Sequence, residues 1–316
     1  MVDLLLAKGY RVHGIDNLSS GRLENLIKHQ NDPEFRILEK DLCDLHPDDA
    51  LVRGAEYIFH FAGIGDIVPS IQKPIDYMSA NIMGTVRALE AARYAGVRKF
   101  VYAASSSCYG LASELPTTEM AQIDPKYPYA LSKYLGEQAV LHWGKLYRLP
   151  VNSIRIFNAY GPRSRTTGSY GAVFGVFLAQ KLANHPFTVV GDGTQKRDFV
   201  FVSDAARAFL AAAETDRVNE IYNLGTGKPQ SVNRLVELLR GDVINVPKRP
   251  GEPDITWADV SRIKRHLGWV PEVPFEIGVS VILDNISYWK DAPIWTPDSI
   301  RSVTEDWFKV LEEDSK

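Results

Sequence analysis

The chain has 316 residues, of which 45% are hydrophobic and 24% are charged, values that allow one large or two coupled domains with a substantial core. The formal net charge is −3, and without a long basic run we expect no nucleic-acid partner. Two cysteines without a C-x-x-C motif, and seven histidines without H-x-H or H-E-x-x-H spacing, indicate neither a disulfide framework nor a metal site. No apolar run reaches the ~18 residues of a membrane span, and the first residues differ from a signal peptide, so we expect a cytoplasmic protein without a membrane partner.

Strands and helices alternate along the first half of the chain. Apolar residues at helical spacing predict helices, and short β-branched or aromatic runs predict buried strands. In chain order these are a helix at 1–9, strands at 11–16, 35–40 and 57–61, a long helix at 74–95, a strand at 99–104, a helix at 129–147 and a strand at 151–157. This order predicts an α/β fold with a parallel sheet and helices on both faces.

The alternation weakens after residue 157, beginning with a loop-rich stretch at 161–171. The remaining predicted elements are a hairpin at 189–197, a strand at 198–204, a helix at 205–213, a strand and turn at 221–227, and helices at 231–239, 259–267 and 275–290. A proline-rich loop is expected at 245–254. A last helix begins after Thr296, with Thr296 as N-cap and Pro297 in its first turn.

A serine cluster and a Tyr-Lys pair stand out in the middle of the chain. Residues 105–110 read SSSCYG after a predicted strand, and residues 127–137 read YPYALSKYLGE at a helix start. Tyr129 and Lys133 are four residues apart, hence on one helix face, and Ser105 could face them from the strand's carboxyl end. A cation beside a phenol favours the phenolate, so the trio suits removal of a proton from an alcohol while a hydride leaves the same carbon. Alone, the Tyr-x-x-x-Lys spacing is equally typical of a surface helix with a half-buried Tyr and a solvated Lys.

Together with RIFNAYGPR at 155–163, these motifs resemble the extended short-chain dehydrogenase/reductase family, and within it the nucleotide-sugar epimerases and dehydratases. The resemblance runs from about residue 3 to about residue 290 and implies a Rossmann-like doubly wound parallel sheet with a smaller C-terminal α/β substrate-binding domain. It places an NAD-binding domain at 1–165 and 198–225, and the substrate domain at 166–197 and 226–316. In this family a glycine-rich turn opens the first helix. We expect that first strand and G-x-x-G-x-x-G turn to be missing ahead of residue 1, and NAD retention to be weak.

The resemblance implies NAD as cofactor and assigns residues to it. Asp16 would accept hydrogen bonds from the adenosine ribose, although an Asp after a strand is otherwise a common turn residue. Phe61-Ala62-Gly63 departs mildly from the family's Leu-Ala-Ala, and the neighbouring His60 is expected in the core. The implied cofactor residues are Asp16, Asn17, Ser20, Asp41, Leu42, Phe61, Ala62, Gly63, Asn81, Tyr129 and Lys133.

The catalytic residues implied are Ser105, Tyr129 and Lys133. Family dehydratases carry Asp-Glu directly after this serine, whereas Ser106 and Ser107 stand here, and neither titrates near neutrality. Elimination is therefore disfavoured and epimerisation favoured. Arg197 and Arg249 match the two arginines that contact the nucleotide diphosphate in this family, and a guanidinium suits bidentate phosphate binding. The implied substrate residues are Ser106, Asn158, Val173, Arg197 and Arg249.

The resulting hypothesis is C4 epimerisation of a UDP-hexose or UDP-N-acetylhexosamine through a 4-keto intermediate. The alternatives are a non-catalytic sugar-nucleotide-binding protein and a 4-keto-sugar-nucleotide reductase. By resemblance we also expect a homodimer that pairs through the helices at 74–95 and 129–147 in a four-helix interface. Met83, Ala88 and Leu135 could contribute to it, although such apolar faces could equally pack on the sheet.

Overall fold

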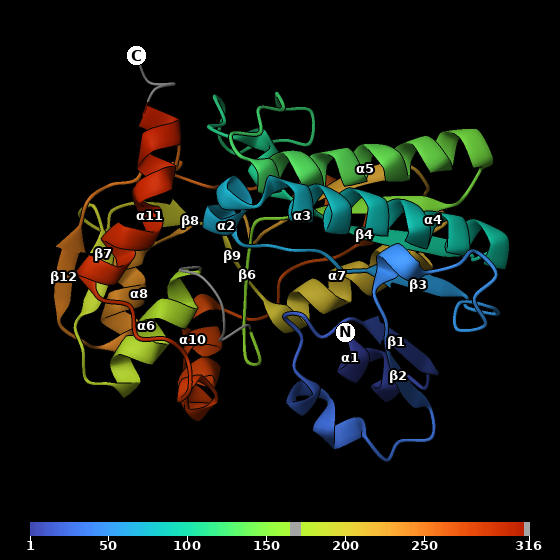
Figure 1. Cartoon of the computed structure of the whole chain (residues 1–316), viewed down its shortest axis with the longest axis horizontal. Helices are drawn as coiled ribbons and strands as arrows, with labels where there is room; N and C mark the ends of the chain where they lie inside the picture. Colours follow the sequence, from blue (N-terminus) through green and yellow to red (C-terminus); the bar gives the residue numbers. More distant parts are fainter. Residues whose placement is uncertain (165–171, 313–316) are drawn as a thin grey trace.

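A parallel sheet forms the centre of the computed structural model, which describes residues 1–164 and 172–312 (Figure 1). Its strands are β3 (Tyr57–His60), β4 (Lys99–Ser105), β5 (Val151–Ile156) and β10 (Glu220–Leu224), and their order across the sheet is β10-β5-β4-β3. Six of the seven β4 residues are buried, as the apolar run KFVYAA predicted. The central strands therefore have core on both faces, which is typical of parallel sheets.

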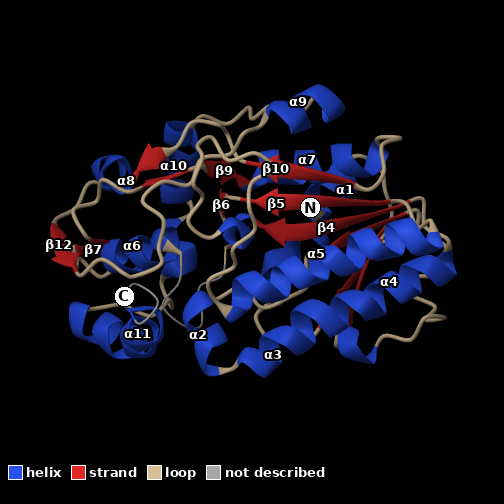
Figure 2. Ribbon diagram, turned by 90° about the horizontal axis from the view of Figure 1, so that it is seen from above, coloured by secondary structure: helices blue, strands red, loops and turns tan. Residues whose placement is uncertain are grey.

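Helices cover both faces of this sheet, as predicted (Figure 2). On one face lie α5 (Pro128–Tyr147) and the long helical stretch made of α3 (Pro74–Met78), a π-helical turn at Ser79–Met83, and α4 (Gly84–Ala95). The stretch ends at Gly96, whose φ of 65° is the left-handed conformation of a helix C-cap. On the other face lies α7 (Val202–Glu214). The α/β class and the two-sided arrangement predicted from the sequence are confirmed.

The first two strands form a sheet of their own. Strands β1 (Val12–Asp16) and β2 (Phe35–Glu39) pair in parallel, and within residues 1–164 and 172–312 neither is hydrogen-bonded to β3. The pair lies beside α1 (Val2–Ala7), and Leu5, Val12 and Phe35 pack with Leu210 of α7. The strands predicted for one parallel sheet thus form two, β1-β2 and β10-β5-β4-β3. That a first strand and glycine-rich turn are missing remains a prediction.

A second, aromatic-rich core holds the other half of the molecule. Tyr160, Phe174, Phe199 and Phe275 pack ring against ring there, with centroids 4.7–6.3 Å apart. The elements of this half and its borders are β6 (Asn158–Tyr160), α6 (Val173–Leu182), β7 (Phe187–Val190), β8 (Lys196–Arg197), β9 (Phe199–Phe201), β11 (Gln230–Ser231), α8 (Val232–Leu239), β12 (Val243–Val246), α9 (Ser261–Leu267), α10 (Phe275–Asp284) and α11 (Pro297–Glu312). The domain boundaries stay predictions, and the one at 165/166 falls in residues 165–171, outside the described residues.

Three predictions in this half, or near it, were wrong or incomplete. The hairpin at 189–197 does not form, because β7 pairs in parallel with the distant β12, and β8 pairs with β11. The strand predicted at 198–204 ends at Phe201, where α7 begins. Helix α2 (Ile67–Gln72) was not predicted; it is short, and its buried Val68 packs against α11. No helix of the described residues is both long and apolar enough to cross a membrane.

Candidate active site

The three predicted catalytic residues lie at the end of β4 and in the first two turns of α5. Ser105 is the last residue of β4, and its Oγ lies 2.8 Å from the Oγ of Ser107. Tyr129 stands in the first turn of α5, close enough to Ser105 for that hydroxyl to lower the pKa of the phenol. Lys133 follows one turn later and is buried. The end of β4 and the first turn of α5 thus bring the Ser105 and Tyr129 side chains together, whereas Lys133, one turn along α5, directs its Nζ at the Tyr102 ring.

Burial has the largest effect on the pKa values of Tyr129 and Lys133. Burial raises the pKa of Tyr129, and the hydrogen bond from Ser105 opposes that rise. Burial lowers the pKa of Lys133 to about 8, against the attraction of Glu137. The Lys133 Nζ lies 4.5 Å from the centre of the Tyr102 ring. Burial, rather than the predicted influence of the Lys133 ammonium, therefore sets the direction of the Tyr129 pKa shift.

Asn81 connects helix α5 to the segment after β3 by hydrogen bonds to both. It lies in the π-helical turn, a feature often found at functional sites. Its Nδ2 donates to Ser132 Oγ at 2.8 Å, and its Oδ1 accepts from the Ile64 N–H at 2.7 Å. Gly63 has a φ of 148°, and a Cβ on it would lie 2.5 Å from Asn81 Oδ1. Only glycine fits here without displacing Asn81.

His60 is a core residue, as predicted. Its ring is buried between Phe100 and Tyr102, with centroids 5.7 Å and 5.6 Å away, and its Nε2 lies 2.9 Å from Thr85 Oγ1. Burial, reinforced by the charge of Lys133, lowers the pKa of His60 to about 3. The imidazole is therefore neutral at pH 7.

The acids assigned to the cofactor meet at the ends of β1 and β2. Asp16 ends β1, and Asn17 donates to Asp41 Oδ2 at 2.8 Å. A hydrogen bond from the Cys43 N–H, with a second from Asn17, lowers the pKa of Asp41, so the carboxylate is charged at neutral pH. Of the other predicted cofactor residues, Ser20 is exposed like Asp16 and Asn17. Leu42 is partly buried against the core, and Phe61 is 46% exposed with its ring 4.6 Å from that of Phe209.

A cavity of about 400 Å³ opens beside Ser105 and Tyr129. It is bounded by the segment 65–68, by the end of β4, by β6 and α6, and by the loop 249–256. All five predicted substrate residues line it, namely Ser106, Asn158, Val173, Arg197 and Arg249. The cavity therefore brings together residues that are far apart in the sequence, such as Ser106 and Arg249, which are about 140 positions apart.

Glu252 holds the two arginines of the cavity together. Its carboxylate lies 2.9 Å from Arg197 Nη2 and 2.9 Å from Arg249 Nε. Burial pushes the pKa of Glu252 upward, but the two guanidiniums outweigh it and keep the pKa below its usual value. Two guanidiniums against one carboxylate leave a net positive charge, which suits an anionic ligand.

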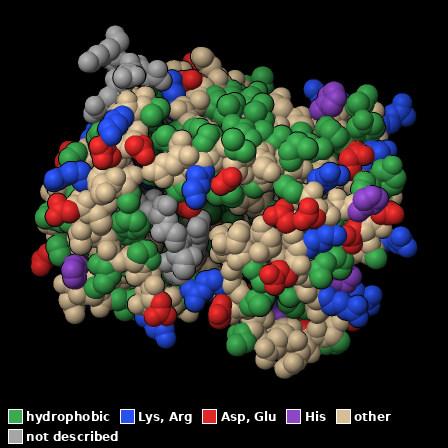
Figure 3. Space-filling model, in the orientation of Figure 1, with side chains coloured by type: hydrophobic (Ala, Val, Ile, Leu, Met, Phe, Trp, Pro, Cys, Tyr) green, Lys and Arg blue, Asp and Glu red, His purple; other side chains and the backbone are tan. Residues whose placement is uncertain are grey.

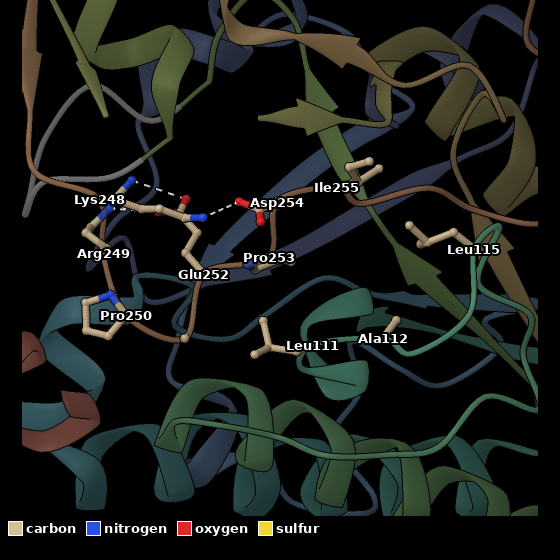
Figure 4. Close-up of a pocket in the computed structure, with 11 residues that line it drawn as sticks. Leu111, Ala112, Leu115, Lys248, Arg249, Pro250, Glu252, Pro253, Asp254 and Ile255 are labelled. Carbon is tan, nitrogen blue, oxygen red and sulfur yellow. Dashed lines mark hydrogen bonds and ion pairs between the residues drawn. The ribbon is translucent and has the colours of Figure 1, made fainter. Parts of the chain in front are cut away.

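A second hollow of about 610 Å³ lies on the other side of the same loop (Figure 4). The loop segment 249–253 contributes residues to both spaces, and Leu111, Ala112 and Leu115 form the opposite side of the outer one. The Lys248–Asp254 ion pair of 2.6 Å lies in this loop. The arginine-bearing loop is therefore a wall between the inner cavity and the surface.

The cavity residues that escaped prediction include Asp66, Tyr127, Glu252 and Trp307. Tyr127 lies in the motif YPYALSKYLGE at 127–137, and Glu252 lies in the proline-rich loop at 245–254 that carries Arg249. Their proximity to predicted site residues was therefore a usable signal. Asp66 and Trp307 had no such signal, because α2 and α11 meet only in the folded chain. Within residues 1–164 and 172–312, no group of three or more His, Cys, Asp or Glu side chains is placed to hold a metal ion.

Comparison with known proteins places this arrangement in a family. The sequence model of the NAD dependent epimerase/dehydratase family matches residues 1–225. The UDP-glucose 4-epimerase of Mycolicibacterium smegmatis is 36% identical over 289 residues, covering 89% of this chain and 92% of that protein. The Bacillus cereus UDP-glucuronic acid 4-epimerase, solved with UDP-glucuronic acid and NAD, superposes with a TM-score of 0.83 at 29% identity, over 90% of this chain and 94% of that one. A UDP-N-acetylglucosamine 4-epimerase from Methanobrevibacter ruminantium, in complex with UDP-N-acetylmuramic acid, has a TM-score of 0.81 at 29% identity, over 87% and 91% of the two chains. The family resemblance inferred from the motifs is thereby confirmed: this chain belongs to the NAD dependent epimerase/dehydratase family.

Proposed function

We propose that the protein interconverts C4 epimers of a UDP-hexose or UDP-N-acetylhexosamine. The observation that carries the proposal is the cavity itself, which is lined both by Ser105 and Tyr129 and by Arg197 and Arg249. The hydroxyl pair suits a sugar hydroxyl that must lose a proton, and the two arginines suit a diphosphate. UDP-glucose, UDP-glucuronic acid and UDP-N-acetylglucosamine 4-epimerases among the similar proteins support the same reaction.

The residues present fit NAD as the cofactor. The Asp16 carboxylate offers acceptors of the kind that bind a ribose diol, beside the charged Asp41. Gly63 leaves open the space before Lys133, where a Cβ would stand 3.8 Å from Nζ. Asp16, Asp41, Gly63 and Lys133 would hold the cofactor, which when bound supplies reversible hydride acceptance from the sugar carbon.

The chain's own groups supply the acid-base work. Tyr129 takes the O4 proton, directly or through Ser105, and returns it after the sugar has turned over. Lys133 is buried one turn along α5, and its positive charge would favour the phenolate form of Tyr129. Arg197 and Arg249 hold the diphosphate while the hexose rotates. Because Ser106 and Ser107 replace the acid-base pair of a dehydratase, the 4-keto sugar is returned to a hexose rather than dehydrated.

The test is NMR detection of the C4 epimer after incubating the protein and NAD⁺ with UDP-glucose or UDP-N-acetylglucosamine. Tyr129→Phe is expected to lower kcat by about 10²–10⁴-fold. Tyr94→Phe is the matched control, because Tyr94 is 63% exposed on α4, and it should leave kcat unchanged. Full activity of Tyr129→Phe would refute the assignment. Turnover only of a 4-keto-sugar nucleotide supplied together with reduced cofactor would point to the reductase, and UDP binding without turnover to the non-catalytic protein.

We also propose a homodimer through α3–α4 and α5. Figure 3 shows hydrophobic side chains gathered over these helices. Ile75 is 80% exposed, Met83 50% and Leu135 38%, whereas Ala88, also predicted for this face, is buried against the sheet. Light scattering should give twice the monomer mass, and Leu135→Arg should give the monomer. A wild-type monomer at micromolar concentration would contradict the proposal.

A further inference from the structure

The last described helix, α11, is fastened over the substrate cavity. Trp307 and Leu311 of α11 are buried against Val68 of α2. Gln72 Nε2, at the end of α2, donates to Asp306 at 2.9 Å. Thr296 Oγ1 accepts from the Ser299 N–H at 3.2 Å, so the helix carries the N-cap that its sequence predicted.

One side chain of this helix, Trp307, also lines the cavity. Its Nε1 donates to the Pro250 carbonyl at 2.8 Å, and the Arg249 guanidinium carbon lies 5.4 Å from its ring. These contacts fix the indole orientation, because a hydrogen bond from Nε1 and a cation–π contact with the ring act on one rigid side chain.

The opposite contact of Trp307 leads to the reactive end. Its ring centroid is 6.0 Å from that of Tyr127, and Tyr127 stacks on Tyr129 at 6.4 Å with 7° between the planes. Trp307 therefore stands between the phenol that would take the O4 proton and the arginine that would bind the diphosphate. In a UDP-hexose the sugar ring connects these two points.

We propose that Trp307 is a specificity-determining residue whose indole bounds the hexose compartment and limits the substituent that the sugar can carry. The inference rests on the proposed function for the identity of the ligand. It assigns α11 a role in substrate selection in addition to packing. Leu311 provides the matched comparison, since it anchors the same helix in the same cluster yet does not line the cavity.

The experiment measures binding by calorimetry, without turnover, for wild type, Trp307→Ala and Leu311→Ala with UDP, UDP-glucose, UDP-N-acetylglucosamine and UDP-glucuronic acid. Two ratios are compared, the Kd of each substituted sugar nucleotide divided by the Kd of UDP-glucose. In Trp307→Ala we expect at least one ratio to fall by about tenfold, since a change of one small group in a pocket discriminates by about 10–200-fold. In Leu311→Ala both ratios should stay at the wild-type value. Trp307→Leu carries the same prediction should the alanine variant not fold, because Leu keeps the apolar contact with α2.

The inference is overturned if both ratios in Trp307→Ala remain within threefold of wild type, or if Leu311→Ala moves them as far. The proposed function is judged separately by the NMR assay. A wild type that binds UDP-glucose and UDP-N-acetylglucosamine but epimerises neither refutes that function, while the ratios still decide the role of Trp307. A wild type that binds none of the four ligands refutes both.

Discussion

A buried ion pair under the active-site helix offers the sharpest test of the physical reasoning. Glu137 lies one turn after Lys133 on α5, and Arg155 faces it from β5, with 1% and 3% of their side chains exposed. Arg155 Nη2 donates to Glu137 Oε1 at 2.6 Å, and its Nε donates to Oε2 at 3.0 Å. Ser153 Oγ adds a third bond to the carboxylate at 2.8 Å. The perturbation is Glu137→Gln, which keeps the shape and removes the charge.

The size of the effect depends on which loss dominates. Weakening neutral hydrogen bonds costs about 0.5–1.5 kcal/mol each, whereas leaving one partner of a buried ion pair uncompensated costs about 3–5 kcal/mol. The guanidinium of Arg155 also donates to the Tyr109 hydroxyl at 2.8 Å and to the Glu119 carbonyl at 3.2 Å, so it cannot turn to water. We therefore expect a loss of about 3–5 kcal/mol in the free energy of unfolding.

Urea unfolding at pH 7, followed by circular dichroism, measures this loss. At a slope of about 3 kcal/mol per molar urea the midpoint should fall by about 1–1.7 M. The double variant Glu137→Leu/Arg155→Met should recover much of the stability, because an apolar pair can replace a buried ion pair. A Glu137→Gln midpoint within about 0.3 M of wild type, or a double variant less stable than Glu137→Gln, would refute the reasoning.

Three further predictions concern pH, packing and binding. The pKa of His60 is about 3 in the folded protein and about 6.5 in the unfolded chain, so the stability that neutral His60 contributes above pH ~6.5 is lost as the pH falls toward 3. In urea titrations, the free energy of unfolding should therefore fall less between pH 7 and pH 4.5 in His60→Gln than in wild type. Equal losses in the two proteins would contradict this. Gly136→Ala should lower the free energy of unfolding by about 1–3 kcal/mol, because the new Cβ would lie 2.3 Å from the Tyr102 hydroxyl. This clash exceeds the gain of about 1 kcal/mol in helix propensity. A raised melting temperature in thermal unfolding would show the packing argument to be wrong. Arg197→Ala should raise the Kd for UDP, measured by calorimetry, by roughly 10–100-fold, as expected for a charge-assisted contact. The control is Lys196→Ala, which should leave this Kd unchanged because Lys196 is exposed. Equal effects of the two substitutions would exclude Arg197 from the diphosphate site.

Local patterns explain why much of the fold was predictable. The run KFVYAA is apolar throughout, and it forms the buried strand β4. Tyr129 and Lys133 needed only helical spacing to share a face, and α5 spans both. Such signals act within a few residues, so they survive without knowledge of the rest of the chain.

Distant pairings explain the failures. Strand β7 at Phe187–Val190 was assigned to a hairpin because turn residues follow it, yet it pairs with β12, more than 50 positions later. Nothing near Glu252 states that its carboxylate would bridge Arg197 and Arg249. The raised pKa of Tyr129 is likewise a property of burial, which the spacing to Lys133 does not report.

The amino-acid order by itself determined the alternation of strands and helices, the family, and the presence of Ser105, Tyr129 and Lys133 at positions where a strand ends and a helix begins. Only the tertiary structure decided that Trp307, the aromatic partner of Tyr127, would complete the cavity from the other end of the chain. The reason is physical. Helical and strand periodicity arises from neighbouring residues, whereas cavity walls and the pKa values inside them arise from whichever surfaces burial brings together.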